Sequence, residues 1–316
     1  MLKLIFMGLL AGLFFSSTFI LNRMMSLEGG HWVWSASLRY AYMILILLIL
    51  TPLLQGIQKT GRLCRYYFRH WPFWTVSGTV GFGGFYSLIC FSADHAPGWV
   101  IATTWQLTII ASLVVLIGFG RSFPRKIWLF SGMVFCGVVM ANFSQAEAVN
   151  AAELCKGAFP VLLAAFCYPI GNQLVWEAKS GRARLPDIRD ALLENPFNKV
   201  LLLSLGSIPF WMILVLVQRP SLPSGGQLVN TAMVAVFSGV IATSLFLNAR
   251  NGAAGAGELA AVDATQSSEV VFAMLGEMLL LNSALPGGMA LAGIFLVIIG
   301  LMLFIWFQEV VAPAGK

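Results

Sequence analysis

Charged residues are scarce in this sequence. Asp, Glu, Lys and Arg make up only 10% of the 316 residues, whereas hydrophobic residues make up 59%. A soluble domain is about one-quarter charged, so this chain has too little polar surface to cover a water-facing globule. The composition therefore excludes a soluble protein and predicts an all-α polytopic membrane protein. In such a protein the positions of the positive charges matter more than the net charge of +6, and we expect no nucleic-acid partner.

The sequence also lacks the usual signatures of metal, nucleotide and covalent chemistry. Its five cysteines are odd in number and show no metal-ligand spacing, which favours free thiols. The glycine-rich stretch Gly81–Phe85 has the wrong spacing for a nucleotide-binding loop and is more typical of close helix packing. His31, His70 and His95 fall at predicted membrane edges or loops. We therefore expect no enzyme, no metal site, no cofactor and no ATP-driven pump.

Long apolar runs are what the sequence has instead. Stretches of about 17–23 apolar residues are long enough to cross a bilayer as a helix. Ten of them occur, at Leu4–Leu21, Trp32–Leu53, Phe73–Ser92, Trp99–Phe119, Ile127–Phe143, Ala158–Trp176, Val200–Val217, Leu228–Leu247, Leu259–Leu281 and Met289–Phe307. We therefore predict ten transmembrane helices.

The loops between these spans alternate in charge. With the N-terminus in the cytoplasm, 15 of the 19 lysines and arginines fall in cytoplasmic segments. Three fall in the outer loops, Arg23, Lys156 and Arg219, and Arg39 lies within a predicted span. Such an excess is the positive-inside signal that sets orientation. Both termini are thus predicted to be cytoplasmic, in a multi-pass protein of the plasma or inner cell membrane.

Two halves of the chain match each other weakly. Lys3 and Phe6 near the start match Lys156 and Phe159 in the second half. An odd number of spans in each half forces the second half to insert upside down. We therefore predict two inverted five-helix repeats, residues 1–146 and 147–316.

The same alignment locates two polar breaks in apolar helices. The stretch "TTWQLT", Thr103–Thr108, falls opposite "TQSSEV", Thr265–Val270. In carriers built from inverted repeats, binding sites lie near the membrane midplane between the repeats. The breaks therefore predict a binding site formed by the fourth and ninth spans.

Three stretches carry a resemblance to a known family. They are "STFILNRMMSLEGGHWVWSASLRY" (17–40), "GFYSLICFSADHAPGWVIATTWQLTIIAS" (84–112) and "AAVDATQSSEVVFAMLGEMLLL" (260–281). The chain resembles the EamA-like drug/metabolite transporter superfamily, and within it the multidrug resistance efflux transporter branch. The resemblance implies a central cavity between two inverted halves, peripheral fifth and tenth helices, and export of small molecules. It also implies kinship with small exporters that exchange protons for drugs at a glutamate in their first span, but the first span here has no carboxylate.

Acidic residues occur instead in the predicted ninth span. Glu269 follows Leu259 by ten residues, which places it about 15 Å into a core about 30 Å thick. A carboxylate at that depth costs about 2.5–3.5 kcal/mol, and burial favours its protonated form, so Glu269 is a candidate proton carrier. A neutral, hydrogen-bonded Glu269 or a pair with Arg39 is the alternative. Asp263, near the cytoplasmic end, is a second candidate for proton coupling, and Glu277 is expected to reach interfacial water.

Other polar and aromatic residues inside the spans are candidates for substrate binding. An arginine such as Arg39 suits a carboxylate or phosphate group, although it also serves in helix packing. An indole such as that of Trp105 stacks on aromatic or cationic groups. The full predicted substrate-binding set is Arg39, Trp105, Gln106, Tyr168, Asn172, Gln266 and Glu269.

These features together predict a secondary active transporter. The leading hypothesis is a proton-coupled exporter of small organic molecules, such as drugs or lipophilic cations, that works by alternating access. The alternative is a metabolite carrier for amino acids or for anionic or phosphorylated compounds held by Arg39. The expected partners are a small-molecule substrate, protons and membrane lipid. A monomer contains both halves and is sufficient, while a dimer stays open.

Overall fold

The computed structural model describes residues 1–311 except 121–122, 124, 146–149, 182–183 and 255. All the regular secondary structure in these residues is helical. Eight helical stretches among the described residues are long and apolar enough to cross a membrane, which agrees with the predicted polytopic membrane protein. They are α1 (Leu2–Leu27), α2 (Trp32–Gln55), α6–α7 (Gly98–Gly118), α8 (Arg125–Phe143), α9 (Ala151–Lys179), α10 (Pro196–Gln218), α11–η3–α12 (Gly225–Asn251) and α15 (Gly288–Val311).

The predicted third and ninth spans are helical but interrupted. The third consists of α4 (Trp71–Gly78), the π-helical turns η1 (Thr79–Gly84) and α5 (Phe85–Ser92). The ninth consists of α13 (Ala256–Ala264), the 3₁₀ turn η4 (Thr265–Ser267) and α14 (Ser268–Leu280). That these two also cross the membrane stays a prediction, as do the inverted repeats and the cytoplasmic termini. The predicted boundary at 146/147 lies outside the described residues.

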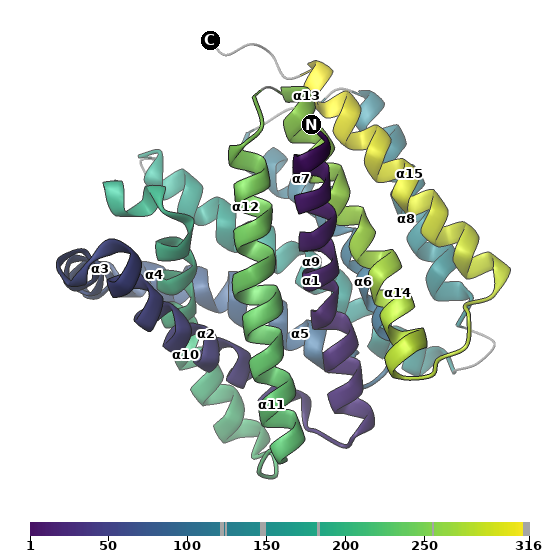
Figure 1. Cartoon of the computed structure of the whole chain (residues 1–316), viewed down its shortest axis with the longest axis horizontal. Helices are drawn as coiled ribbons and strands as arrows, with labels where there is room; N and C mark the ends of the chain where they lie inside the picture. The colour runs from purple at the N-terminus through teal and green to yellow at the C-terminus, as the bar shows by residue number, and fades with distance from the viewer. Residues whose placement is uncertain (121–122, 124, 146–149, 182–183, 255, 312–316) are drawn as a thin grey trace.

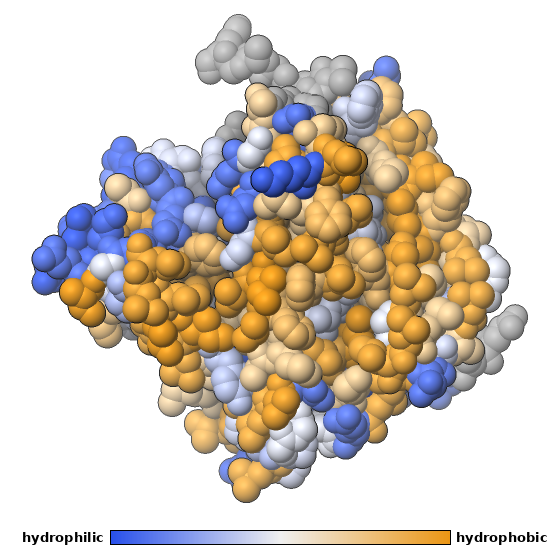
Figure 2. Space-filling model, viewed as in Figure 1, coloured by the Kyte–Doolittle hydropathy of each residue, from blue (hydrophilic) through white to orange (hydrophobic). Residues whose placement is uncertain are grey.

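One further helix lies between the second and third predicted spans. Gly56 ends α2 with φ +86°, a conformation that glycine adopts without strain, and α3 (Ile57–Arg69) follows directly. Figure 1 shows α3 projecting to one side of the bundle. Figure 2 shows hydrophilic side chains gathered around this projection and toward the helix ends, with a broad hydrophobic surface over the middle of the bundle. A hydrophobic middle between polar ends is what a bilayer requires.

Helices α8 and α15 lie side by side at one edge of the bundle (Figure 1). Glycines allow their backbones to approach closely, because a Cβ atom on Gly137 would lie only 2.6 Å from the Gly293 carbonyl oxygen. Such contacts between small residues are a common way for membrane helices to associate. This pair corresponds to the fifth and tenth predicted spans.

Two helices widen into π-helical turns near the centre of the bundle. These are η1 and η3 (Ala235–Ala242), and each contributes residues to the central cavity described below. Gly81 in η1 packs on the backbone of Gly171 in α9, where an added Cβ would lie 3.0 Å from the Gly171 Cα. Since π-helical turns redirect side chains and often mark functional sites, these segments position residues that a regular helix would turn elsewhere.

Candidate functional site

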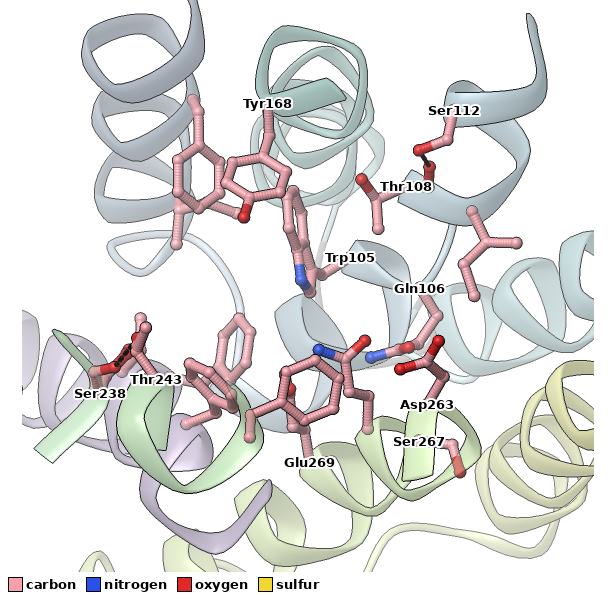
Figure 3. A pocket seen from close by; sticks show the side chains of 18 of the residues that line it. Trp105, Gln106, Thr108, Ser112, Tyr168, Ser238, Thr243, Asp263, Ser267 and Glu269 are labelled. Carbon is pink, nitrogen blue, oxygen red and sulfur yellow. Dashed lines mark hydrogen bonds between the residues drawn. The ribbon is translucent and has the colours of Figure 1, made fainter. Parts of the chain in front are cut away.

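A cavity of about 580 Å³ lies among the helices. It is lined by residues from both predicted halves of the chain, including Arg39 of α2 and Glu269 of α14. Figure 3 shows side chains from several helices pointing into this space. Its size falls within the range typical of small-molecule sites, about 300–1,000 Å³.

The helical breaks predicted from the sequence both lie at this cavity. Helix α6 ends at Trp105 and α7 begins at Thr108, while η4 interrupts the ninth predicted span at Thr265–Ser267. Trp105, Gln106 and Gln266 line the cavity. The Gln106 amide also donates to the Ala102 carbonyl oxygen of its own helix, at 3.2 Å. The breaks thus place polar groups on an otherwise apolar wall.

Three aromatic rings form a cluster on one side of the cavity. Trp105, Phe85 and Tyr168 lie with ring centroids 4.8 Å (Phe85–Trp105), 5.2 Å (Phe85–Tyr168) and 5.8 Å (Trp105–Tyr168) apart. Figure 3 shows Trp105 and Tyr168 projecting into the same space. Aromatic faces attract cations and stack on planar groups, most strongly where water is excluded. This aromatic cluster can therefore hold an organic cation or an aromatic ring.

Glu269 lies in the first turn of α14 and is only 7% exposed. It lines the cavity, and Figure 3 shows it on the opposite side from Tyr168. Within the described residues its carboxylate has no hydrogen-bond partner and no cationic nitrogen within 4.0 Å. The alternative that Glu269 pairs with Arg39 is therefore not found in this conformation. The start of a helix favours a negative charge, whereas burial opposes it.

Arg39 of α2 is 9% exposed and also lines the cavity. Its Nη2 atom donates to Ser238 Oγ in η3, at 3.1 Å. Its Cζ atom lies 4.0 Å from the centre of the Tyr86 ring, which is a close cation–π contact. The Nε atom is buried without a hydrogen-bond partner.

Asp263, the second residue predicted for proton coupling, forms an ion pair. Its Oδ1 atom lies 3.1 Å from Nε of Arg250, in the last turn of α12. Both side chains line the cavity and are partly exposed, 30% for Asp263 and 43% for Arg250. Asp263 therefore lies in a wetter setting than Glu269. The sequence signal for this pair was an arginine at the end of one span and an acid just inside the next.

Asn172 is the one predicted binding residue that does not line the cavity. Its amide instead donates to the Tyr168 carbonyl oxygen one turn earlier in α9, at 2.9 Å. The remaining six of the predicted set line the cavity with Asp263.

The expectation that Glu277 reaches interfacial water is wrong. Glu277 is 1% exposed, and its carboxylate accepts hydrogen bonds from the backbone N–H groups of Gly98 and Trp99, at 2.7 and 3.3 Å. These are the first residues of α6, whose N–H groups lack partners within the helix. Glu277 thus joins α14 to the start of α6.

Several lining residues were not singled out from the sequence. They include Tyr40, Phe82, Phe85, Ser238, Thr243 and Arg250. Two of them, Phe82 and Ser238, lie in the π-helical turns, whose wide geometry no apolar pattern reveals. The aromatic residues resemble ordinary core residues in a sequence that is 13% aromatic.

Comparisons with known proteins agree with this architecture. A family model described as "Putative multidrug resistance efflux transporter" (EmrE) matches residues 2–310. "Uncharacterized protein YjlA" of Bacillus subtilis (strain 168) is 37% identical, and the match covers 100% of this chain and 98% of that protein. "Uncharacterized 42.1 kDa protein in intracellular alkaline protease 3'region" of Shouchella clausii is 33% identical over 78% of this chain and 65% of its own length. A solved structure, "Crystal structure of protein", shares the fold with a TM-score of 0.62 at 15% identity over 98% of each chain.

Proposed function

The chain belongs to the EmrE-like multidrug resistance efflux transporter family, and we propose that it exports organic cations in exchange for protons. Members of this family are multi-pass transporters of small molecules in the cell membrane. Glu269 would bind the proton in one state and the cation in the other. The aromatic cluster of Phe85, Trp105 and Tyr168 would hold the apolar part of the cargo.

The observation that carries this proposal is the setting of Glu269. It is a buried acid that faces a cavity and has no cationic partner among the described residues. An acid inside a membrane protein is costly unless it is protonated or paired. A proton and an organic cation each neutralise it, so they compete for one site.

The shape of the cavity wall supports alternating access. Helical breaks at 105–108 and 265–267, and π-helical turns at 79–84 and 235–242, surround the cavity. Transporters with inverted repeats form their binding sites from such interrupted helices, and one repeat rocks against the other around the site to open it to each side in turn. The breaks and the π-helical turns occur in pairs, one member from each half, and this pairing supports the ten-span, two-repeat arrangement within the proposal. Both halves line one cavity, so a monomer is sufficient.

Proton-driven transport in proteoliposomes tests the proposal. A pH gradient is expected to drive accumulation of radiolabelled phenyltrimethylammonium, a permanent cation that carries no proton itself. Glu269→Gln should bring accumulation down to that of empty liposomes, while Glu28→Gln, at an exposed position, should transport as the wild type does. Gradient-driven accumulation by Glu269→Gln at the wild-type rate would rule out the role of Glu269.

A further inference from the structure

Arg39 is a second buried charge without a counter-charge. Within the described residues no acidic oxygen lies within 4.0 Å of its guanidinium, and its Nε atom lacks a hydrogen-bond partner. Glu277, by contrast, is buried with two backbone N–H donors. A buried charge without a partner is strongly unfavourable, so its presence beside a cavity points to a ligand.

The surroundings hold Arg39 in place without neutralising it. Tyr86 presents its ring face to the guanidinium, and the Tyr86 hydroxyl is fixed by the Asn22 amide at 3.0 Å. Ser238 accepts one hydrogen bond from Nη2. A cation–π contact and a neutral hydroxyl orient the guanidinium but leave its net charge unchanged. The planar group therefore keeps donors for an anionic ligand.

Arg39 and Glu269 line the same cavity with opposite charges, and neither pairs with the other. The other two charged residues of the lining, Arg250 and Asp263, form an ion pair. A cargo with only a cationic group satisfies Glu269 and leaves Arg39 uncompensated. A cargo with only an anionic group satisfies Arg39 and leaves Glu269 uncompensated. A molecule that carries both groups can neutralise both residues.

We propose that the Arg39 end of the cavity is an anion-binding subsite, and that the preferred cargo is a zwitterion. Its anionic group lies at Arg39, its cationic group lies at Glu269, and its apolar part packs on the aromatic cluster. The cationic half of this inference rests on the proposed function. A free anion such as chloride offers the same chemistry to Arg39, and the experiment distinguishes the two sources.

Three probes that share a benzene ring and differ in their charged groups test the subsite. They are phenyltrimethylammonium, benzoate and 4-(trimethylammonio)benzoate, titrated calorimetrically into purified protein in chloride-free detergent buffer. The wild type should bind the zwitterion at least tenfold more tightly than either singly charged probe. Arg39→Gln should remove this preference and weaken benzoate at least tenfold, but leave phenyltrimethylammonium unchanged or tighter. Arg65→Gln, at an exposed position in α3, should change nothing.

Three results would overturn all or part of the inference. Equal affinity of the wild type for all three probes contradicts a zwitterionic cargo. If a folded Arg39→Gln protein loses affinity equally for all three probes, Arg39 has a structural role alone. Chloride that displaces benzoate, with no preference for the zwitterion, assigns the subsite to a free anion and overturns the cargo assignment.

If Arg39→Gln fails to fold, the titrations of the wild type alone test the anion subsite. A wild type that shows no preference for the zwitterion, and in which chloride does not compete with benzoate, has no anion subsite. Proton release on phenyltrimethylammonium binding reports on Glu269 separately. If the wild type releases no protons on binding phenyltrimethylammonium but still prefers the zwitterion, the proposed proton exchange is contradicted and the Arg39 subsite is supported.

Discussion

Oε1 of Glu277 lies 2.7 Å from the backbone nitrogen of Gly98, across 179 residues of sequence. The contact leaves no room for a side chain at residue 98, because a Cβ atom there would lie 2.7 Å from the Phe19 carbonyl oxygen and 3.2 Å from Glu277 Oε1. The carboxylate therefore caps α6 and ties it to α14, close to α1. These three helices all contribute to the cavity wall.

Replacement of Glu277 is expected to destabilise the protein. Glu277→Ala leaves two buried N–H groups without acceptors, and hydrogen bonds to a charged group are worth about 1.5–3 kcal/mol. Thermal unfolding in detergent, followed by tryptophan fluorescence, should show a clear fall in the midpoint. Glu194→Ala, at an exposed position, is the control and should match the wild type. An unchanged midpoint for Glu277→Ala would mean that the cap adds nothing.

The contact between α8 and α15 depends on glycine at its closest point. Gly137→Ala places a Cβ atom 2.6 Å from the Gly293 carbonyl oxygen, and such overpacking costs about 1–3 kcal/mol. Gly132 lies in the same helix, and a Cβ atom added there would have no neighbour within 4 Å, so Gly132→Ala should be neutral or up to about 1 kcal/mol more stable. Thermal unfolding should show a lower midpoint for Gly137→Ala than for Gly132→Ala. Equal midpoints contradict the close approach of these helices.

Asp263 is expected not to carry the coupled proton. It is paired with Arg250 and partly exposed, and an exposed pair contributes only about 0–1 kcal/mol. Asp263→Asn should therefore fold normally and keep the wild-type number of protons released on cation binding. A variant in which Asp263→Arg and Arg250→Asp are combined should bind phenyltrimethylammonium as the wild type does. If Asp263→Asn abolishes proton release, the coupled acid is Asp263 and not Glu269.

Trp105 is expected to contribute to cation affinity through its ring. Trp105→Ala removes one face of the aromatic cluster and should weaken phenyltrimethylammonium by about 0.5–2 kcal/mol, whereas Trp105→Phe should retain most of the affinity. Titration calorimetry measures both. Trp306→Ala removes an indole that is 67% exposed on α15 and should leave affinity unchanged. If Trp105→Ala binds as tightly as the wild type, the aromatic cluster has no part in binding.

The sequence predicts the helical class, eight of the spans and seven of the residues that line the cavity. Length and hydropathy determine the spans, because a bilayer demands about 20 apolar residues whatever the partners are. Arg39 and Glu269 stand out because charges are rare and costly inside a membrane. The predicted breaks at Trp105 and Thr265 rest on local polar residues, and local polarity is visible in a sequence.

What the sequence does not predict depends on contacts between distant segments. The backbone donors to Glu277 lie in another helix and cannot be seen in the sequence. The position of Glu277 near a membrane edge therefore suggested a residue in contact with water. Ser238 lies 199 residues after Arg39 in the chain and reaches it from η3, which packs near α2. The neighbours of Asn172 in the chain suggested that it binds substrate, yet its amide donates a hydrogen bond within its own helix. These outcomes follow from side-chain direction in three dimensions, which periodicity does not give.

The central claim is that a proton and an organic cation compete for Glu269. We would titrate phenyltrimethylammonium into purified protein in weakly buffered detergent and measure protons released per cation bound, for the wild type and for Glu269→Gln. We expect release by the wild type and an affinity that rises with pH, because fewer protons then occupy the carboxylate. Glu269→Gln should release no protons, and any remaining binding should be independent of pH. Binding to the wild type without release, or equal release by both proteins, would contradict competition at Glu269.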